Sequence, residues 1–246
     1  MISGLILSFQ FLTRIPLNVK IEMNSKNIAK STFFFPFIGT VIGALSAGAY
    51  YIGLLMGKDI AALLGVLVLI FVTGGLHIDG LSDTCDGFFS SREKEKILEI
   101  MKDSCSGTFG VIAIVLDILV KYLLLSRLQA NVLPCLMLSC ANARLTAVML
   151  MSFTKTARPG GLGAMFSDSI TKRYFYLCSS LYVALIISFF GVKSLVPLAA
   201  AMVSSFIIAN KAYRTIGGLT GDVYGANIEI CEIVSIAAFQ AVALWI

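Results

Sequence analysis

A short stretch in the first half of the chain places three carboxylates at a spacing that suits metal chemistry. Asp79, Asp83 and Asp86 follow one another at intervals of four and three residues. At about 100° per residue, these positions share one narrow face of a helix. Carboxylates on one face repel each other, and no Lys or Arg between residues 60 and 91 offsets the repulsion. The oxygen donors predict a Mg²⁺ site, with a solvated acidic loop as the alternative.

A second acidic motif lies far along the chain, at residues 217–229. Asp222 and Glu229 are seven residues apart and share a helix face if the helix is continuous. The glycines of this motif permit another backbone to approach closely. The motif predicts either a partner for the first acidic cluster or an ordinary helix N-terminus, where acidic residues favour the helix dipole.

Four further positions suit a negatively charged ligand. Arg158 precedes a Gly-rich loop, and Arg14 lies in the short segment Phe-Leu-Thr-Arg-Ile-Pro. Both arginines suit a phosphate or an anionic lipid headgroup, and the sequence leaves these two alternatives open. Asp103 and Ser104 open a turn of small residues whose backbone N–H groups are able to hold phosphate.

The composition shows which elements must position these side chains. Of the 246 residues, 58% are hydrophobic and 13% are charged, and the mean hydropathy is +0.90. An average soluble domain carries about 25% charged residues. These values exclude a disordered chain and indicate that the bilayer is the solvent. The net charge of +5 does not predict a nucleic-acid partner, because no polar segment is long enough to form a binding domain.

We therefore predict an all-α membrane bundle of about six or seven transmembrane helices, formed by residues 1–246 as one domain. Residues 1–13 are apolar but too short to cross a bilayer. A polar helix with an apolar stripe at Ile97, Ile100 and Met101 is expected to lie on the membrane surface. Seven segments are candidates for spans, at residues 32–56, 60–76, 107–128, 132–153, 174–192, 194–209 and 228–246.

The connections between these segments alternate between minimal and long. Fourteen of the 19 Lys and Arg residues lie in the long connections, at residues 14–31, 77–106, 154–173 and 210–227. The positive-inside rule then places the long connections in the cytoplasm. We expect a multi-pass protein of the cell (inner) membrane, with both acidic motifs on the cytoplasmic side.

Several ionisable residues lie within or beside the apolar segments. Asp117 and Lys121 are four residues apart and are able to neutralise each other, whereas Arg144 needs a partner from another helix. His77, the only histidine, stands two residues before Asp79. It is open to two interpretations, a catalytic base and a structural hydrogen-bonding residue.

With these motifs in place, the chain resembles the cobalamin synthase family, the adenosylcobinamide-GDP ribazoletransferases. The resemblance covers nearly the whole chain. It rests on Phe-Leu-Thr-Arg-Ile-Pro at 11–16, on the blocks at 34–39, 74–88, 92–110, 157–163 and 217–229, and on Lys121 and Arg144.

The resemblance implies a phosphotransferase reaction that needs Mg²⁺. A hydroxyl of α-ribazole, or of its 5′-phosphate, attacks adenosylcobinamide-GDP; GMP leaves, and adenosylcobalamin or its phosphate forms. Asp79, Asp83, Asp86 and Asp222 are expected to hold the metal, and Asp83 or His77 to accept the proton of the attacking hydroxyl. The residues expected to bind substrate are Arg14, Lys102, Asp103, Ser104, Arg158, Asn227 and Glu229.

Two other functions fit parts of the sequence. A CDP-alcohol phosphotransferase also places aspartates on membrane helices, but its pattern has an Ala-Arg pair that this chain lacks after Asp86. A transporter predicts ionisable residues near the middle of the bilayer, and Asp117, Lys121 and Arg144 are the only ones that favour it. The expected partners are the two substrates and the lipid bilayer. A homo-oligomer and contacts with other enzymes of the pathway stay open.

Overall fold

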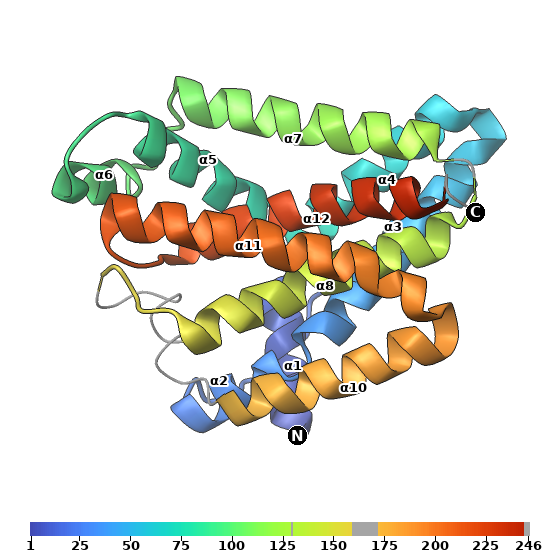
Figure 1. Cartoon of the computed structure of the whole chain (residues 1–246), viewed down its shortest axis with the longest axis horizontal. Coiled ribbons are helices and arrows are strands. Elements are labelled where there is room, and N and C mark those ends of the chain that lie inside the picture. The colour runs from blue at the N-terminus through green and yellow to red at the C-terminus, as the bar shows by residue number, and fades with distance from the viewer. Residues whose placement is uncertain (129, 159–171, 244–246) are drawn as a thin grey trace.

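The computed structural model shows a bundle of helices (Figure 1). It describes residues 1–128, 130–158 and 172–243. Within these residues there is no β-strand, and one isolated bridge joins Thr156 to Leu219. The predicted all-α class is therefore confirmed.

The helices follow one another along the chain, with two short 3-10 turns between them. In order they are α1 (Ile2–Leu12), α2 (Ser25–Thr32), α3 (Phe35–Gly53), η1 (Leu54–Met56), α4 (Lys58–Thr73), α5 (Leu76–Phe89), α6 (Lys94–Ile100), α7 (Thr108–Arg127), α8 (Val132–Phe153), α10 (Lys172–Phe190), η2 (Val192–Ser194), α11 (Leu195–Ile216) and α12 (Gly221–Ala243).

In the described part of the chain, six helices are long and apolar enough to cross a membrane: α3 with η1, α7, α8, α10, α11 with η2, and α12. Helices α4 and α5 are long and apolar enough to cross a membrane only when they are taken together. They are bent by 89° at the break between them. Counting this pair as one broken span gives seven. The predicted range of six to seven transmembrane helices is confirmed.

The break between α4 and α5 comes from two glycines in a left-handed conformation. Gly74 and Gly75 have φ angles of 66° and 73°, which glycine adopts without steric cost. The apolar run had predicted a span that continues to residue 76. Instead α4 ends at Thr73, and the first acidic motif forms a separate helix, α5.

The two kinds of connection gather at opposite ends of the bundle (Figure 1). Helix α6 and the turn between α11 and α12 lie at the left end of the view. The short links at η1, between α7 and α8, and at η2 lie at the right end, near the C-terminus. Among the described residues, the long connections at 77–106 and 210–227 therefore lie at the end of the bundle opposite to the three minimal ones.

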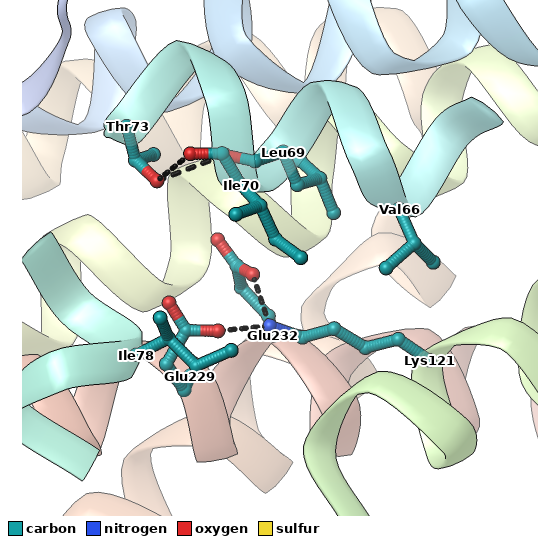
Figure 2. Close-up of a pocket in the computed structure, with 8 residues that line it drawn as sticks. All are labelled: Val66, Leu69, Ile70, Thr73, Ile78, Lys121, Glu229 and Glu232. Carbon is teal, nitrogen blue, oxygen red and sulfur yellow. Dashed lines mark hydrogen bonds and ion pairs between the residues drawn. The ribbon is translucent and has the colours of Figure 1, made fainter. Parts of the chain in front are cut away.

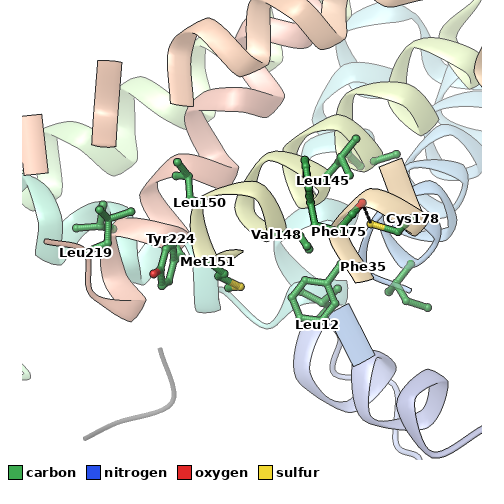
Figure 3. Packing of buried hydrophobic residues seen from close by; sticks show 14 of the residues in the cluster. Leu12, Phe35, Leu145, Val148, Leu150, Met151, Phe175, Cys178, Leu219 and Tyr224 are labelled. Atoms are coloured by element: carbon green, nitrogen blue, oxygen red, sulfur yellow. Dashed lines mark hydrogen bonds between the residues drawn. The ribbon is translucent and has the colours of Figure 1, made fainter. Parts of the chain in front are cut away.

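Helix α8 forms the centre of the bundle. In its most apolar window 78% of the residues are buried, whereas α7 buries 22% and turns most of its apolar side chains outward. Small residues let α3 approach α8 closely: a Cβ added to Gly39 would stand 2.5 Å from the carbonyl oxygen of Cys140. The buried cluster in Figure 3 joins Leu12 and Phe35 to Leu145 of α8.

The start of α12 and the surroundings of α6 differ from the prediction in a way that affects the site. Helix α12 begins at Gly221 rather than at residue 228, because the Thr220 hydroxyl accepts the Val223 N–H at 3.3 Å and caps the helix. Helix α6 covers only residues 94–100. Ile97 and Met101 are buried, and the Met101 side chain lies against Gly87 of α5, so most of the stripe that we expected on the membrane packs inside the protein.

Candidate functional site

The first acidic motif forms α5, as the spacing predicted. Asp79 is exposed and Asp83 is half-buried on the same face of this helix. Within the described part of the chain, neither carboxylate has a hydrogen-bond or ion-pair partner. Their oxygens therefore remain available to a ligand.

Helix α12 brings the second acidic motif against α5. A Cβ added to Gly80 would stand 2.8 Å from the carbonyl oxygen of Asp222, and one added to Gly225 would stand 3.1 Å from that of His77. A Cβ at Gly80 would force the two helix backbones apart, and one at Gly225 would make a tight contact with α5. The two motifs, more than 130 residues apart in the sequence, therefore meet at one place, with Asp222 beside the turn that carries Asp79 and Asp83.

Arg158 joins this place through a strand-like contact. The Leu219 N–H donates to the carbonyl of Lys155 at 2.9 Å, and the Ala157 N–H donates to the carbonyl of Leu219 at 2.8 Å. These bonds hold the end of the α8 connection beside the start of α12. The Arg158 guanidinium then donates to the Asp222 carboxylate at 3.1 Å.

Asp86, the third carboxylate of the first acidic motif, has hydrogen-bond partners that the prediction did not include. Its two carboxylate oxygens accept the N–H of Gly107 at 2.7 Å and that of Gly110 at 2.8 Å. These N–H groups belong to the N-cap residue and to the first turn of α7, and they have no partner within the helix. The turn at residues 103–110 therefore binds a carboxylate of the protein where we had expected phosphate, and Asp86 caps α7.

The predicted set of four metal ligands is not assembled as one cluster. In the described ranges, no three acidic, His or Cys side chains lie close enough to hold a metal ion between them. Asp86 is occupied by α7, and Asp222 is paired with Arg158. Asp79 and Asp83 remain, and one or two carboxylates are what Mg²⁺ commonly uses when it binds together with a substrate phosphate. The residues present fit that ion in this mode and do not form a cage of protein ligands.

The other exposed candidates lie around α5. The Arg14 side chain packs on Gly74 at the break that precedes α5, and the backbone N–H of Arg14 donates to the carbonyl of Val72 at 2.7 Å. Lys102 and Ser104 are exposed in the turn after α6. Asp103 accepts the N–H of Cys105 at 3.0 Å within that turn. Roles for these residues in substrate binding stay predictions.

Asn227 and Glu229 lie elsewhere than the sequence suggested. Because α12 begins seven residues earlier than expected, both are inside the bundle, with exposed fractions of 0% and 6%. The Asn227 amide donates to the Thr146 hydroxyl at 3.2 Å, and the Glu229 carboxylate pairs with Lys121. Neither side chain is open to solvent in the structure, and a role for these two residues in substrate binding stays a prediction.

A buried network of charges lies behind the exposed carboxylates. Lys121 pairs with Asp117 at 3.1 Å, with Glu232 at 2.9 Å and with Glu229. Arg144 pairs with the other oxygen of Glu232. Figure 2 shows Glu229 and Glu232 converging on the Lys121 ammonium beside a cavity of about 10 Å³, close to the smallest space that one water molecule needs.

Glu232 is the residue of this network that the sequence analysis missed. The predicted pair of Asp117 and Lys121 is present, and the partner that Arg144 required from another helix is Glu232. A signal was available, because Glu232 follows Glu229 by three residues on the same helix face. His77 also belongs to this network: it is 3% exposed, and its Nδ1 lies 3.5 Å from a terminal nitrogen of Arg144.

Comparison with known proteins gives a consistent result. The family model described as cobalamin-5-phosphate synthase matches residues 4–240. Proteins named adenosylcobinamide-GDP ribazoletransferase are similar to the chain: one of Treponema denticola is 37% identical and covers 94% of each sequence, and one of Escherichia coli K12 is 38% identical and covers 93% of this chain and 95% of its own. One of Clostridium novyi is 37% identical and covers 96% of this chain and 95% of its own. No solved structure matches the chain.

Proposed function

The chain belongs to the cobalamin-5-phosphate synthase family, and we propose that it acts as an adenosylcobinamide-GDP ribazoletransferase. In this reaction a hydroxyl of α-ribazole, or of its 5′-phosphate, attacks the phosphorus next to cobinamide. The bond from that phosphorus to the GMP oxygen breaks and GMP leaves. The product is adenosylcobalamin or its phosphate.

One observation of the structure supports this reaction best: two free carboxylates lie where two distant motifs meet. Asp79 and Asp83 have no partner in the described residues, and the Arg158–Asp222 pair lies beside them. Phosphoryl transfer needs positioning and charge neutralisation more than covalent help from the protein. The carboxylates of α5 are able to hold a metal ion, and the neighbouring guanidinium is able to bind phosphate. Together they supply both the positioning and the charge neutralisation.

Magnesium is part of this proposal. Asp79 and Asp83 would hold it, with Asp222 as a third carboxylate if Arg158 turns to the substrate. When bound, Mg²⁺ neutralises charge on the pyrophosphate. The guanidinium of Arg158 suits the remaining phosphate oxygens, because its planar fork donates two parallel hydrogen bonds. Arg14 and Lys102 are further candidates for this contact.

We assign the proton of the attacking hydroxyl to Asp83. A general base must lie within hydrogen-bond reach of the hydroxyl, which requires a carboxylate that substrate can approach. Asp83 is half-buried on the ligand-facing side of α5 and has no described partner. His77, the other candidate, is buried on the opposite side of α5, in contact with Arg144.

We propose that the protein is embedded in the cell membrane with the α5 end of the bundle facing the cytoplasm. The spanning helices support a multi-pass arrangement. The excess of Lys and Arg in the long connections supports this orientation. Substrates that are nucleotide derivatives would then meet the site from the cytoplasm.

The function is tested with membranes that contain the protein, supplied with adenosylcobinamide-GDP, α-ribazole and Mg²⁺. We expect GMP to be released in step with the corrinoid product, and chelation of the metal to stop the reaction. Membranes with Asp83→Asn serve as the matched control. If the native chain releases no GMP under these conditions, the proposed function is wrong.

A further inference from the structure

Helix α5 carries the proposed catalytic carboxylates, but nothing in its own sequence fixes its direction. It begins after the left-handed pair Gly74 and Gly75, and Gly75, the residue that precedes its first turn, supplies no side-chain cap. Two glycines in succession leave the chain free to choose many angles at this break. The orientation of Asp79 and Asp83 must therefore be set by contacts of α5 with other helices.

His77 provides such a contact in the first turn of α5. It lies two residues before Asp79, which places it about 160° around the helix from that carboxylate. The imidazole consequently points into the bundle while the carboxylates face outward. In the described residues its only hydrogen-bond partner is Arg144, because Nε2 has none.

Arg144 is itself held rigidly at the centre of the bundle. Its side chain has an exposed fraction of 0%, and it pairs with Glu232 of α12. It also donates to the carbonyl of Cys140, one turn earlier in α8, at 3.4 Å. Glu232 in turn accepts from Lys121 of α7. The guanidinium therefore stands at a fixed point with respect to three spanning helices.

We propose that Arg144 is a positioning residue that acts through His77 to fix the orientation of α5, and so of Asp79 and Asp83. This inference rests on the proposed function for its effect on turnover, but the geometry of α5 is testable without substrate. The backbone contacts of Gly80 with Asp222 and of Gly225 with His77 set how close α5 comes to α12. The link from Arg144 to His77 sets how α5 is rotated at that distance.

The test compares turnover in four single variants and one double variant. Arg144→Met removes the donor and His77→Leu removes the acceptor, and each is expected to lower turnover roughly 10- to 100-fold, as small misplacements of reacting groups do. His77→Asn keeps an acceptor close to the position of Nδ1 and is expected to restore turnover to within about threefold. Arg144→Lys keeps a cation but loses the guanidinium geometry and should fall between.

The double variant Arg144→Met with His77→Leu distinguishes a shared route from separate effects. If Arg144 acts through His77, the double variant is no slower than the slower single variant. A loss of turnover in the double variant that equals the product of the two single losses would overturn the proposal. Normal turnover in His77→Leu would overturn it as well. Where Arg144→Met does not fold because Glu232 is left unpaired, Arg144→Met with Glu232→Met removes both buried charges and takes its place.

A measurement without substrate separates this proposal from the proposed function. Spin labels are attached at Phe89→Cys on α5 and Lys211→Cys on α11, both exposed, after Cys85 and Cys105 are replaced by Ser. The distance distribution is expected to be narrow in the otherwise native chain and in His77→Asn, and to broaden or shift in Arg144→Met and His77→Leu. An unchanged distribution would refute the positioning role. Absence of GMP release in the native chain would refute only the proposed function.

Discussion

Gly80 of α5 lies in direct backbone contact with Asp222 of α12, so that a Cβ on the glycine would stand 2.8 Å from the Asp222 carbonyl oxygen and 3.1 Å from its Cα. Gly80 is the residue after Asp79, and Asp222 lies in the first turn of α12. A side chain at this position would have to push the two helices apart. The meeting of the two acidic motifs therefore depends on one missing methyl group.

Replacing Gly80 by alanine tests this dependence. We expect Gly80→Ala to displace α5 from α12 and to lower GMP release by at least about tenfold, because reacting groups must be held within a fraction of an ångström. Gly48→Ala is the matched control, since a Cβ there meets no atom within 4 Å and alanine favours a helix. The rate of GMP release per folded protein is measured for both. Equal rates in the two variants would show that the contact is not needed.

Much of this site could be predicted because it depends on local spacing. The intervals between Asp79, Asp83 and Asp86 defined one helix face, and α5 has that face. The alternation of connections placed Asp222 at the same end of the molecule. The break at Gly74 was missed because the apolar run continues past it to Leu76, so hydropathy gave no sign of a bend.

The remaining features depend on packing between helices that are distant in the sequence. Arg144 pairs with a residue 88 positions away, and only the assembled bundle determines which acidic residue that is. Asp86 looked like its two neighbours in the motif. It differs because the N-terminus of α7 lies against it and donates two N–H groups to its carboxylate. No spacing rule in the sequence predicts that α7 meets α5 at this point.

The role of Asp86 as a cap leads to an effect on stability. Asp86→Ala would leave the N–H groups of Gly107 and Gly110 without their partner, and loss of a helix cap costs about 1–2 kcal/mol. We expect a lower melting temperature in detergent. Asp86→Asn should fall between, because the amide retains one acceptor oxygen. The apparent Mg²⁺ affinity for GMP release should stay within about twofold in Asp86→Asn; a large loss of that affinity with unchanged melting would instead favour a metal ligand.

Asp83→Asn is expected to affect chemistry and to leave stability unchanged. The amide keeps the shape of the side chain but does not accept a proton, and removal of a general base typically costs about 100- to 10,000-fold. GMP release under saturating substrate and Mg²⁺ measures the loss. Glu95→Gln, a change of the same kind at an exposed position of α6, should retain the native rate. Full activity in Asp83→Asn would contradict both its proton-accepting and its metal-binding role.

Arg158 is expected to bind a phosphate of the substrate in addition to its ion pair with Asp222. Arg158→Ala removes a charge-assisted hydrogen bond to phosphate, worth about 1.5–3 kcal/mol, so that KM for adenosylcobinamide-GDP should rise roughly 10- to 100-fold. Arg158→Lys keeps the charge without the planar fork and should recover only part of this loss. Titrations of initial rate against adenosylcobinamide-GDP separate KM from kcat. An unchanged KM in Arg158→Ala would assign the guanidinium to Asp222 alone.

The Lys121 ammonium pairs with three buried carboxylates and compensates their charge. Lys121→Met would leave Asp117, Glu229 and Glu232 with Arg144 as their only described cation, and breaking a buried ion pair from one side costs about 3–5 kcal/mol. We expect the melting temperature in detergent to fall by about 10 °C. Glu229→Gln is the informative contrast, because Lys121 then retains two carboxylates and the amide still accepts its hydrogen bond. A loss in Glu229→Gln as large as that in Lys121→Met would mean that all the charges of the network, and not only the central ammonium, are needed to hold α7 to α12.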